Sequence, residues 1–302
     1  MSAKVVVVGS LNMDLVACAE RLPRAGETLA GDRFFTAPGG KGGNQAVAAS
    51  RLGASVAIIG SVGDDAYGRQ LRQALEDEQI DCQAVSVCPD VSSGVALIVV
   101  EAASQNAIIV IAGSNGRLLP ESVQRFDALL QGAEVIVCQL EVPLATVAWT
   151  LRRGRELGKT VILNPAPAAG PLPRDWLGLV DYLIPNESEA QALTGLPVTD
   201  PGSAVRAAEH LLKGGVGKVI VTLGAQGAVF VSARGSRHYP APQVCARDTI
   251  AAGDTFVGGF AAALARGMVE EDAIELGQRA AAIAVTRAGA QPSIPRLAEL
   301  AP

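Results

Sequence analysis

Short runs of valine and isoleucine recur along this chain, and stretches with helical periodicity separate most of them. The apolar runs are "KVVVVG", "SVAIIGSVG", "AEVIVCQLE", "KTVILNPAP", "DYLIPNESE" and "KVIVTLG". The stretches between them include "NQAVAASRLG", "YGRQLRQALEDEQ", "PLATVAWTLRRGRELG" and "SAVRAAEHLLKGG", and two further helical patterns span residues 253–267 and 270–287. Apolar strands separated by amphipathic helices are typical of a mainly parallel sheet with helices on both faces. The sequence therefore predicts a three-layer α/β/α fold.

Two segments interrupt this alternation, because they have the pattern of β strands with no helix between them. They span residues 13–37 and 92–113, and the second, "SSGVALIVVEAASQNAIIVIAG", predicts a hairpin that turns at "ASQN". Such insertions in an α/β chain suggest a small sheet that stands off the main body as a lid. No repeat, low-complexity tract or linker divides the chain, so we expect one domain over residues 1–302 with a discontinuous lid.

Composition places the chain among globular proteins and narrows its partners. Of its 302 residues, 49% are hydrophobic and 18% are charged, which is enough for a sizeable core. The formal net charge is −5, and acidic and basic residues are interspersed without a run of lysine or arginine. This pattern argues against binding to nucleic acid or to an anionic membrane.

The cysteines and the apolar runs favour a cytoplasmic protein. The five cysteines are scattered and form no C-x-x-C pair: Cys18, Cys82, Cys88, Cys138 and Cys245. Their odd number and irregular spacing fit free thiols in a reducing compartment better than disulfides or zinc ligands. Polar residues interrupt the opening stretch "MSAKVVVVGSLNMDLV", and no apolar run reaches the roughly 18 residues of a membrane span. We therefore expect neither a signal peptide nor a membrane-spanning helix.

Several common site types are not expected. "GRELGKT" (residues 154–160) resembles a phosphate-binding P-loop, but only three residues separate its glycines, and it follows a helix and precedes a strand, the reverse of the required order. We interpret it as the end of a helix. No G-x-G-x-x-G occurs, and with only His210 and His238 present, histidine catalysis and a zinc site are not expected either.

The stretch "PGGKGGNQAVAASRLG" (residues 38–53) is a stronger candidate for a ligand site. Its clustered glycines allow a backbone to approach a ligand closely, and they carry an entropic cost if they have no role. Asn44 then begins a helix and has both a donor and an acceptor, which suits a hydroxyl-rich ligand. The alternative interpretation is an ordinary glycine-rich loop with an asparagine cap.

Polar residues also follow the ends of several predicted strands. They are Asn12 and Asp14 after the first strand, Glu141 and Asn186 after two later strands, and Thr222, with Gly224, after a further strand. Each alone would fit a turn or a helix cap. Ligands in open α/β sheets bind beyond the carboxyl ends of the strands, so together these residues predict a site at that edge.

The stretch "DTIAAGDTFVGGF" (residues 248–260) predicts an anion site beside a carboxylate. Ala251, Ala252 and Gly253 would present unpaired N–H groups at a helix N-terminus, which favours a negatively charged group such as a developing phosphate. Asp254 is an acceptor when ionised, so it could take a proton from an attacking hydroxyl. The alternative is that Asp254 only complements the helix dipole.

With these strings in view, the chain resembles the ribokinase-like (PfkB) carbohydrate kinases over essentially its whole length. "GGKGGNQAVAASRLG" and "DTIAAGDTF" match the two signatures of that family, in the same order and at opposite ends of the chain. "GSLNMDLV", "NPAPA", "PNESEA", "TLGAQG" and "AAIAVTRAGAQPS" match further family strings. The resemblance implies a ribokinase-like fold and ATP-dependent phosphorylation of the 5-hydroxyl of D-ribose. Many members have glycine where this chain has Ala251, and the alanine favours ribose over other sugars.

The resemblance also implies a role for individual residues. Asp254 matches the catalytic base, and the backbone of Ala251, Ala252 and Gly253 matches the anion hole. The sugar would be held by Asn12, Asp14, Gly40, Lys41, Asn44 and Glu141, together with Asp254. Nucleotide-side positions match Asn186, Thr222, Gly224, Gly227, Gly253 and Gln278, the last in place of an Asn or His near the adenine. Glu189 matches a position near Mg²⁺ and the phosphates.

A monovalent cation, K⁺, is implied as an activator near the anion hole, held mostly through backbone carbonyls. The matching positions are Asp248, Ile250, Ala284, Arg287, Gly289 and Ser293.

The sequence is also consistent with two other functions and with a dimeric state. A sibling kinase could act on deoxyribose, fructose, 2-keto-3-deoxygluconate or a nucleoside, because lid and pocket residues decide the substrate. A non-catalytic sugar- or nucleotide-binding regulator is a competitor from another class, although the base and the anion hole are intact here. Two lids could also pair in a homodimer, because lid hairpins expose edges and an apolar face.

Overall fold

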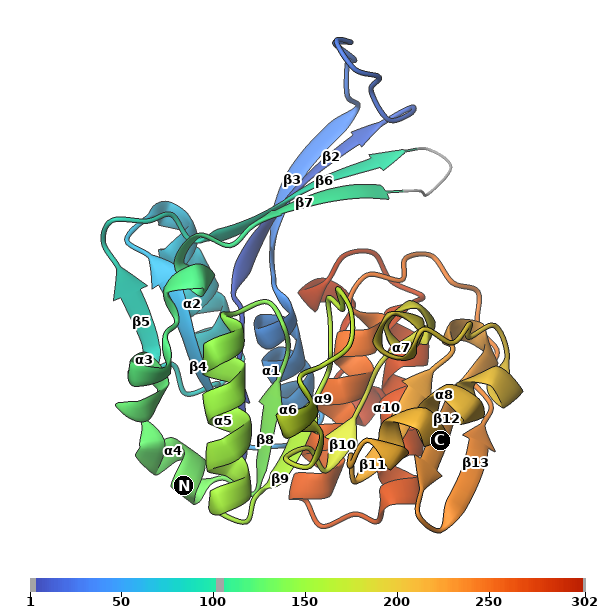
Figure 1. The fold of residues 1–302 in the computed structure, drawn as a ribbon. Coiled ribbons are helices and arrows are strands. Elements are labelled where there is room, and N and C mark those ends of the chain that lie inside the picture. Colours follow the sequence, from blue (N-terminus) through green and yellow to red (C-terminus); the bar gives the residue numbers. More distant parts are fainter. Residues whose placement is uncertain (1–3, 102–105, 301–302) are drawn as a thin grey trace.

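A nine-stranded sheet forms the centre of the molecule in the computed structural model, which describes residues 4–101 and 106–300 (Figure 1). The strand order is β13-β12-β11-β10-β9-β8-β1-β4-β5, and every pairing from β5 to β11 is parallel. Only β12 and β13 run antiparallel to their neighbours. The strands are β1 (Val5–Val8), β4 (Val56–Gly63), β5 (Val85–Cys88), β8 (Val135–Cys138), β9 (Thr160–Leu163), β10 (Tyr182–Leu183), β11 (Lys218–Thr222), β12 (Ala228–Ser232) and β13 (Gly235–Tyr239).

Helices cover both faces of this sheet. On one face lie α1 (Lys41–Arg51), α2 (Ala66–Asp77), α9 (Ala252–Ala265) and α10 (Glu270–Ala284). On the other lie α3 (Pro120–Gln124), α4 (Asp127–Gly132), α5 (Leu144–Glu156), α6 (Arg174–Leu177), α7 (Glu187–Thr194) and α8 (Pro201–Lys213). In β1, Val5 and Val7 pack in the first layer and Val6 and Val8 in the second, because successive strand residues point to opposite faces. The predicted three-layer α/β/α fold is confirmed.

Four short 3₁₀ helices complete the described secondary structure. They are η1 (Gly113–Arg117), η2 (Gly224–Gln226), η3 (Gln291–Ser293) and η4 (Leu297–Leu300). None of the helices in the two described ranges combines the length and the apolar character needed to cross a bilayer.

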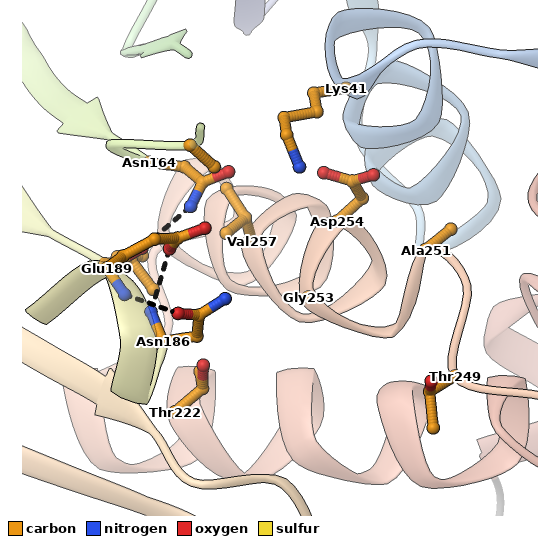
Figure 2. Close-up of a pocket in the computed structure, with 12 residues that line it drawn as sticks. Lys41, Asn164, Asn186, Glu189, Thr222, Thr249, Ala251, Gly253, Asp254 and Val257 are labelled. Carbon is orange, nitrogen blue, oxygen red and sulfur yellow. Dashed lines mark hydrogen bonds between the residues drawn. The ribbon is translucent and has the colours of Figure 1, made fainter. Parts of the chain in front are cut away.

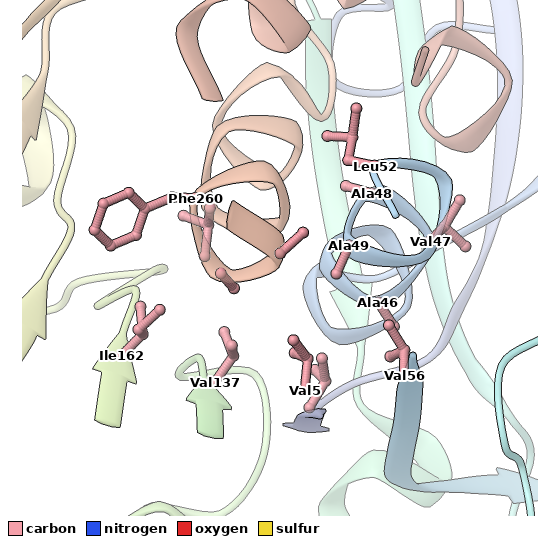
Figure 3. Close-up of a cluster of buried hydrophobic side chains, with 14 of the residues drawn as sticks. Val5, Ala46, Val47, Ala48, Ala49, Leu52, Val56, Val137, Ile162 and Phe260 are labelled. Carbon is pink, nitrogen blue, oxygen red and sulfur yellow. The ribbon is translucent and has the colours of Figure 1, made fainter. Parts of the chain in front are cut away.

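The close packing of α1 against α9 determines the position of the candidate site. Figure 3 shows the alanines of α1 and Phe260 of α9 above Val5, Val137 and Ile162 of three neighbouring strands. A Cβ atom at Gly258 of α9 would lie 2.5 Å from both the Ala48 Cβ atom and the Gln45 carbonyl oxygen of α1. The two helix backbones can approach this closely only because residue 258 lacks a side chain. Their N-terminal turns are thereby held together at one edge of the sheet.

A second sheet of four strands stands away from the main body, beyond the ends of the parallel strands (Figure 1). Its order is β3-β2-β6-β7, formed by β2 (Asn12–Ala19), β3 (Arg33–Gly39), β6 (Gly94–Glu101) and β7 (Asn106–Ile111). Strands β6 and β7 pair antiparallel, as the predicted hairpin requires. Most of its predicted turn, residues 103–105, lies outside the described residues.

Strand register divides the side chains of the small sheet between two faces. Val16, Ala96 and Ile98 are buried on one face. The register places Phe34, Leu97, Ile109 and Ile111 together on the opposite face, where each is between 41% and 66% exposed. We call this second group the exposed apolar face. Contiguous exposed apolar side chains of this kind are a feature of surfaces that bind a partner.

Candidate active site

A cavity of about 170 Å³ lies at the carboxyl edge of the large sheet (Figure 2). The N-terminal turns of α1 and α9 border it on one side, and the ends of β9, β10 and β11 border it on the other. Among the residues that the sequence singled out, those that line it are Lys41, Asn186, Glu189, Thr222, Ala251, Gly253 and Asp254. The prediction that polar residues after several strands meet at one edge is borne out for Asn186 and Thr222, which form a parallel bridge.

Asp254 lies in the first turn of α9, and its carboxylate is held by side chains of α1. Asn44 Nδ2 donates to Oδ2 at 2.9 Å, and Gln45 Nε2 donates to Oδ1 at 2.9 Å. The residue is 7% exposed. The N-cap of α9 is Ala251, and no side chain caps this helix end. Asp254 therefore does not bond to its own helix N-terminus, and its carboxylate is available at the cavity wall.

The backbone before Asp254 exposes N–H groups to the cavity. Ala251 has φ 58° and ψ 11°, a left-handed conformation that is uncommon for a residue other than glycine. Within the described part of the chain, no acceptor bonds to the N–H groups of Gly253 and Asp254, and Ala252 N–H makes a long 3.3 Å bond to the Thr249 carbonyl. A Cβ atom at Gly253 would meet nothing within 4 Å. Free donors, open space and the helix dipole together suit an anion.

Buried carboxylates surround one amine at this site. Burial raises the pKa of Asp14 to about 7, and repulsion from Glu141 and Asp254 adds to the shift. Burial likewise raises the pKa of Glu189, although the Asn186 N–H and Lys41 act against it.

Lys41 compensates part of this negative charge. Burial acts to lower its pKa, but attraction to the carboxylates, of which Asp254 is the strongest, outweighs burial. The net pKa of Lys41 lies above its usual range, so its amine is a cation at neutral pH. Figure 2 shows this amine beside the Asp254 carboxylate. The site therefore offers many hydrogen-bond acceptors and one cation, an arrangement that suits a neutral ligand rich in hydroxyl groups.

The predicted sugar-side residues come from β2, from the β3–α1 junction with the first turn of α1 and, in the case of Glu141, from the segment that follows β8. Glu141 Oε2 accepts bonds from Ser10 Oγ at 2.5 Å and from Lys41 N–H at 3.0 Å. Gly40 has φ 82°, and a side chain there would crowd the Asn12 backbone nitrogen at 2.7 Å. These contacts hold the glycine-rich loop directly against the end of β1.

One acceptor on this side has no partner. Asn44 Oδ1 is buried and makes no hydrogen bond within the residues that the structure describes. An unpaired buried oxygen carries a free-energy cost unless a ligand supplies a donor. Asn44 thus holds Asp254 with its nitrogen, while its oxygen has no donor among the described residues.

The predicted nucleotide-side residues divide into two groups. Asn186 caps α7 in a reciprocal capping box, in which its Oδ1 accepts from Glu189 N–H at 2.8 Å and Glu189 Oε2 accepts from Asn186 N–H at 2.9 Å (Figure 2). Gly224, Gly227 and Gln278 do not line the cavity. Gln278 is buried and donates to the Tyr239 carbonyl at 2.8 Å.

The two segments predicted to hold a monovalent cation are bonded to each other. Asp248 Oδ1 accepts from Ile250 N–H at 3.0 Å, and its Oδ2 accepts from Gly289 N–H at 2.8 Å. Asp248 N–H donates in turn to the Val285 carbonyl. The remaining predicted positions lie on the same two segments, with Ala284 O accepting from Arg287 N–H and Ser293 Oγ donating to Ala290 O. The first segment leads directly into Ala251.

Sequence reasoning missed several polar residues of the site. Asn164 and Thr249 line the cavity, and Gln45 bonds to Asp254. Asn115 donates to Asn12 Oδ1 at 2.7 Å. Asn164 follows β9 in the same way that Asn186 follows β10, so the strand-end argument could have found it. Nothing in the local sequence marks Asn115, because its partner lies 103 residues away.

Comparison with known proteins gives matches along nearly the whole chain. The model of the pfkB family of carbohydrate kinases matches residues 2–297. A ribokinase of Haemophilus influenzae is 43% identical over 296 residues, covering 98% of this chain and 96% of that protein. A deoxyribokinase of Salmonella typhi is 39% identical over 293 residues, with coverage of 97% and 96%. The structure of Arabidopsis thaliana ribokinase complexed with ribose and ATP matches with a TM-score of 0.93 at 31% identity, covering 99% of this chain and 98% of that one.

The raised pKa of Asp14 predicts a pH-dependent gain in stability from Asp14→Asn. The folded state retains a proton that the unfolded state releases between pH 3.8 and about 7, so this residue lowers the free energy of unfolding as pH rises through that window. The loss amounts to roughly 1.5 kcal/mol at pH 5 and is on the order of 4 kcal/mol at pH 8. Asparagine carries no charge, so the Asp14→Asn variant does not lose this stability as the pH rises. Urea unfolding of the ligand-free protein should therefore show a larger stabilisation at pH 8 than at pH 5, and equal effects at both pH values would contradict the assignment.

Proposed function

The chain belongs to the pfkB family of carbohydrate kinases, and we propose that it transfers the terminal phosphoryl group of ATP to the 5-hydroxyl of D-ribose. As a member of this family it is a phosphotransferase that acts on an alcohol group. Ribokinases are among its relatives, and one solved relative holds ribose and ATP. The observation that carries the proposal is the placement of the Asp254 carboxylate beside free N–H groups at the start of α9. A base and an anion site on one cavity are what phosphoryl transfer to a hydroxyl requires.

Asp254 acts as the general base in this proposal. Its oxygens already accept from two amides, and a carboxylate oxygen has room for one further donor, the hydroxyl of the sugar. Proton transfer to a positioned carboxylate contributes roughly 10²–10⁴ to the rate.

The backbone from Ala251 to Gly253 forms the anion hole. The Gly253 N–H group is free, and the Ala252 N–H group makes only a long bond, so both could donate to negative charge on the transferring phosphoryl group, with the α9 dipole adding to their effect. The left-handed conformation of Ala251 starts α9 at the cavity wall, which includes Ala251, Gly253 and Asp254. Losing one preorganised donor of this kind typically lowers the rate by about 10²–10³.

The sugar and the nucleotide approach Asp254 from two sides. Asn12, Asp14, Gly40, Lys41, Asn44 and Glu141 bind the sugar hydroxyls. Asn186, Glu189, Thr222, Gly224, Gly227, Gly253 and Gln278 lie on the side of the nucleotide. The unpaired Asn44 Oδ1 supports the first set, because it is a buried acceptor that the protein leaves without a donor.

Two metal ions belong to the proposal. In the described ranges no three His, Cys, Asp or Glu side chains meet in a group that could hold a metal. Magnesium keeps several waters and binds substrate phosphates, so Glu189 at the cavity wall would hold it through water. Bound with ATP, magnesium neutralises charge on the phosphates.

The bonded segments around Asp248 and Gly289 fit a monovalent cation, K⁺. Backbone carbonyls of Ile250, Ala284, Arg287 and Gly289, together with Asp248 and Ser293, would hold it. A cation there would fix the segment that leads into the anion hole.

The small sheet serves as a lid in this proposal. Strand β2 carries both Asn12 and Asp14, so the lid and part of the sugar site are one piece of structure. Closing such a lid over the sugar excludes water from the reaction. We propose further that two lids pair in a homodimer through the exposed apolar face, and that the enzyme works in the cytoplasm, where its free cysteines stay reduced.

The principal alternative is a different acceptor. The Salmonella typhi relative is a deoxyribokinase at 39% identity, so a 2-deoxy sugar is a specific competitor. Fructose, 2-keto-3-deoxygluconate and nucleosides are more distant ones. A non-catalytic regulator is disfavoured because Asp254 and its amide partners are intact.

ADP release with Mg-ATP and a panel of acceptors tests the proposal directly. The panel contains D-ribose, 2-deoxyribose, fructose, 2-keto-3-deoxygluconate, adenosine and uridine, each with K⁺ or with a bulky organic cation. We expect the highest kcat/KM for D-ribose, and a clear loss of turnover when the organic cation replaces K⁺. Faster turnover of another acceptor would overturn the substrate assignment, and equal turnover in both salts would overturn the cation site.

Sedimentation velocity tests the homodimer. We expect a dimer at micromolar concentration and a monomer for Ile109→Lys, because a charge on the exposed apolar face cannot be buried between two copies. Ile108→Lys is the matched control, since Ile108 lies on the same strand but on the opposite face and is also exposed. A monomeric wild-type protein, or equal effects of the two variants, would contradict this interface.

A further inference from the structure

Three buried amide side chains form a connected row that ends at Asp254. Gln45 and Gln139 are fully buried, and Asn164 is 8% exposed. Gln45 Nε2 donates to Asp254 Oδ1 at 2.9 Å and to Asn164 Oδ1 at 3.0 Å. Gln45 and Gln139 do not line the cavity, so neither is placed to contact a substrate. The row therefore acts on the site only through Asp254 and Asn164.

The orientation of the Gln45 amide is fixed by its partners. Both hydrogens of its Nε2 are used, and its Oε1 accepts from Gln139 Nε2 at 2.6 Å. Asn164 is oriented in turn by the main chain, because its Nδ2 donates to the Ile184 carbonyl at 2.9 Å. A reversed Gln45 amide would place its oxygen against two other oxygens. Gln45 thus presents a donor, and only a donor, to the carboxylate.

Packing alone does not account for this row. Burying an amide is unfavourable unless all of its hydrogen bonds are made, and an apolar side chain of similar volume would fill the same space. Gln139 Oε1 has no partner within the described residues. A Cβ atom at Gly9 would overlap with that oxygen, so the residue that follows β1 is a glycine that leaves room for Gln139. Gln139 Oε1 thus stays unpaired within the described residues, while the hydrogen bond from Gln45 Nε2 to Asp254 is kept.

We propose that Gln45 is a positioning residue for Asp254, an inference that rests on the proposed role of Asp254 as the base. Two consecutive residues of α1 hold the two carboxylate oxygens, Asn44 at Oδ2 and Gln45 at Oδ1. Together they hold the carboxylate in one orientation, because each of its oxygens accepts a hydrogen bond from a different side chain. The remaining lone pairs then face the sugar hydroxyl in one fixed geometry, as efficient proton transfer requires.

Gln45→Met removes the amide and keeps the approximate length of the side chain. We expect kcat to fall by about 10–100-fold, as for other small misplacements of a catalytic group. The KM for ATP should stay within about two-fold, because Gln45 does not line the cavity.

A double-mutant cycle separates positioning from a purely structural role. In an Asp254→Asn background, Gln45→Met should change kcat by less than about two-fold, because the group that it positions is absent. Thr150→Val is the matched control, since Thr150 is also buried and hydrogen-bonded but lies on α5, away from the site. It should lower the melting temperature and leave kcat within about two-fold. Equal losses of kcat from Gln45→Met in both backgrounds would overturn the proposal.

The assay tests the role of Gln45 separately from the assignment of D-ribose as the substrate. It uses D-ribose or, if another acceptor is phosphorylated faster by the wild-type protein, that acceptor. A wrong sugar assignment therefore leaves the test of Gln45 valid. If Gln45→Met does not fold, Gln139→Met takes its place, because it leaves the Asp254 contact and removes only the support of Gln45 Oε1. A smaller fall in kcat is then expected, which should be absent in the Asp254→Asn background, and an unchanged kcat would overturn the proposal.

Discussion

The close approach of α1 and α9 is the contact on which the rest of the site depends. The two helices can meet only because Gly258 lacks a side chain where the backbone of Gln45 and the Ala48 side chain pass. The contact holds two N-terminal turns together, one with the amides of residues 44 and 45 and the other with Asp254 and its free N–H groups. A separation of even one ångström would break both carboxylate bonds. The position of Asp254 beside free N–H groups is thus a consequence of core packing.

Electrostatics explains why this arrangement suits a sugar kinase. Several carboxylates share the site with one lysine, and burial leaves Asp14 with a pKa of about 7. Mutual repulsion of this kind destabilises the empty protein. Hydroxyl groups of a bound ligand would reduce this repulsion by donating hydrogen bonds to the carboxylates. Part of the binding free energy would then come from the repulsion that is removed. Next to these carboxylates, the free N–H groups and the positive end of the α9 dipole favour an anion.

The sequence predicts most of the fold because its information there is local. Val5 to Val8 alternate between two helical layers, and the small sheet draws its strands from the two segments without helices. Asn186 and Thr222 could be placed at one edge because parallel strands all end there. The partners of Gln45 could not be predicted, since Asn164 and Gln139 lie 119 and 94 residues away. The sequence could not decide whether Asp254 only complements the helix dipole. The structure adds that its carboxylate accepts hydrogen bonds from two side chains of α1.

The most direct test of Asp254 as the base combines the kinetics of the Asp254→Asn variant with a calorimetric measurement of its affinity for D-ribose. Asparagine keeps the size and one acceptor of the side chain but cannot take the hydroxyl proton. We expect kcat to fall by roughly 10²–10⁴ while the Kd for D-ribose changes far less, since the other sugar-side residues remain. A variant that kept full turnover would contradict the assignment of Asp254 as the base, although the fold would stand.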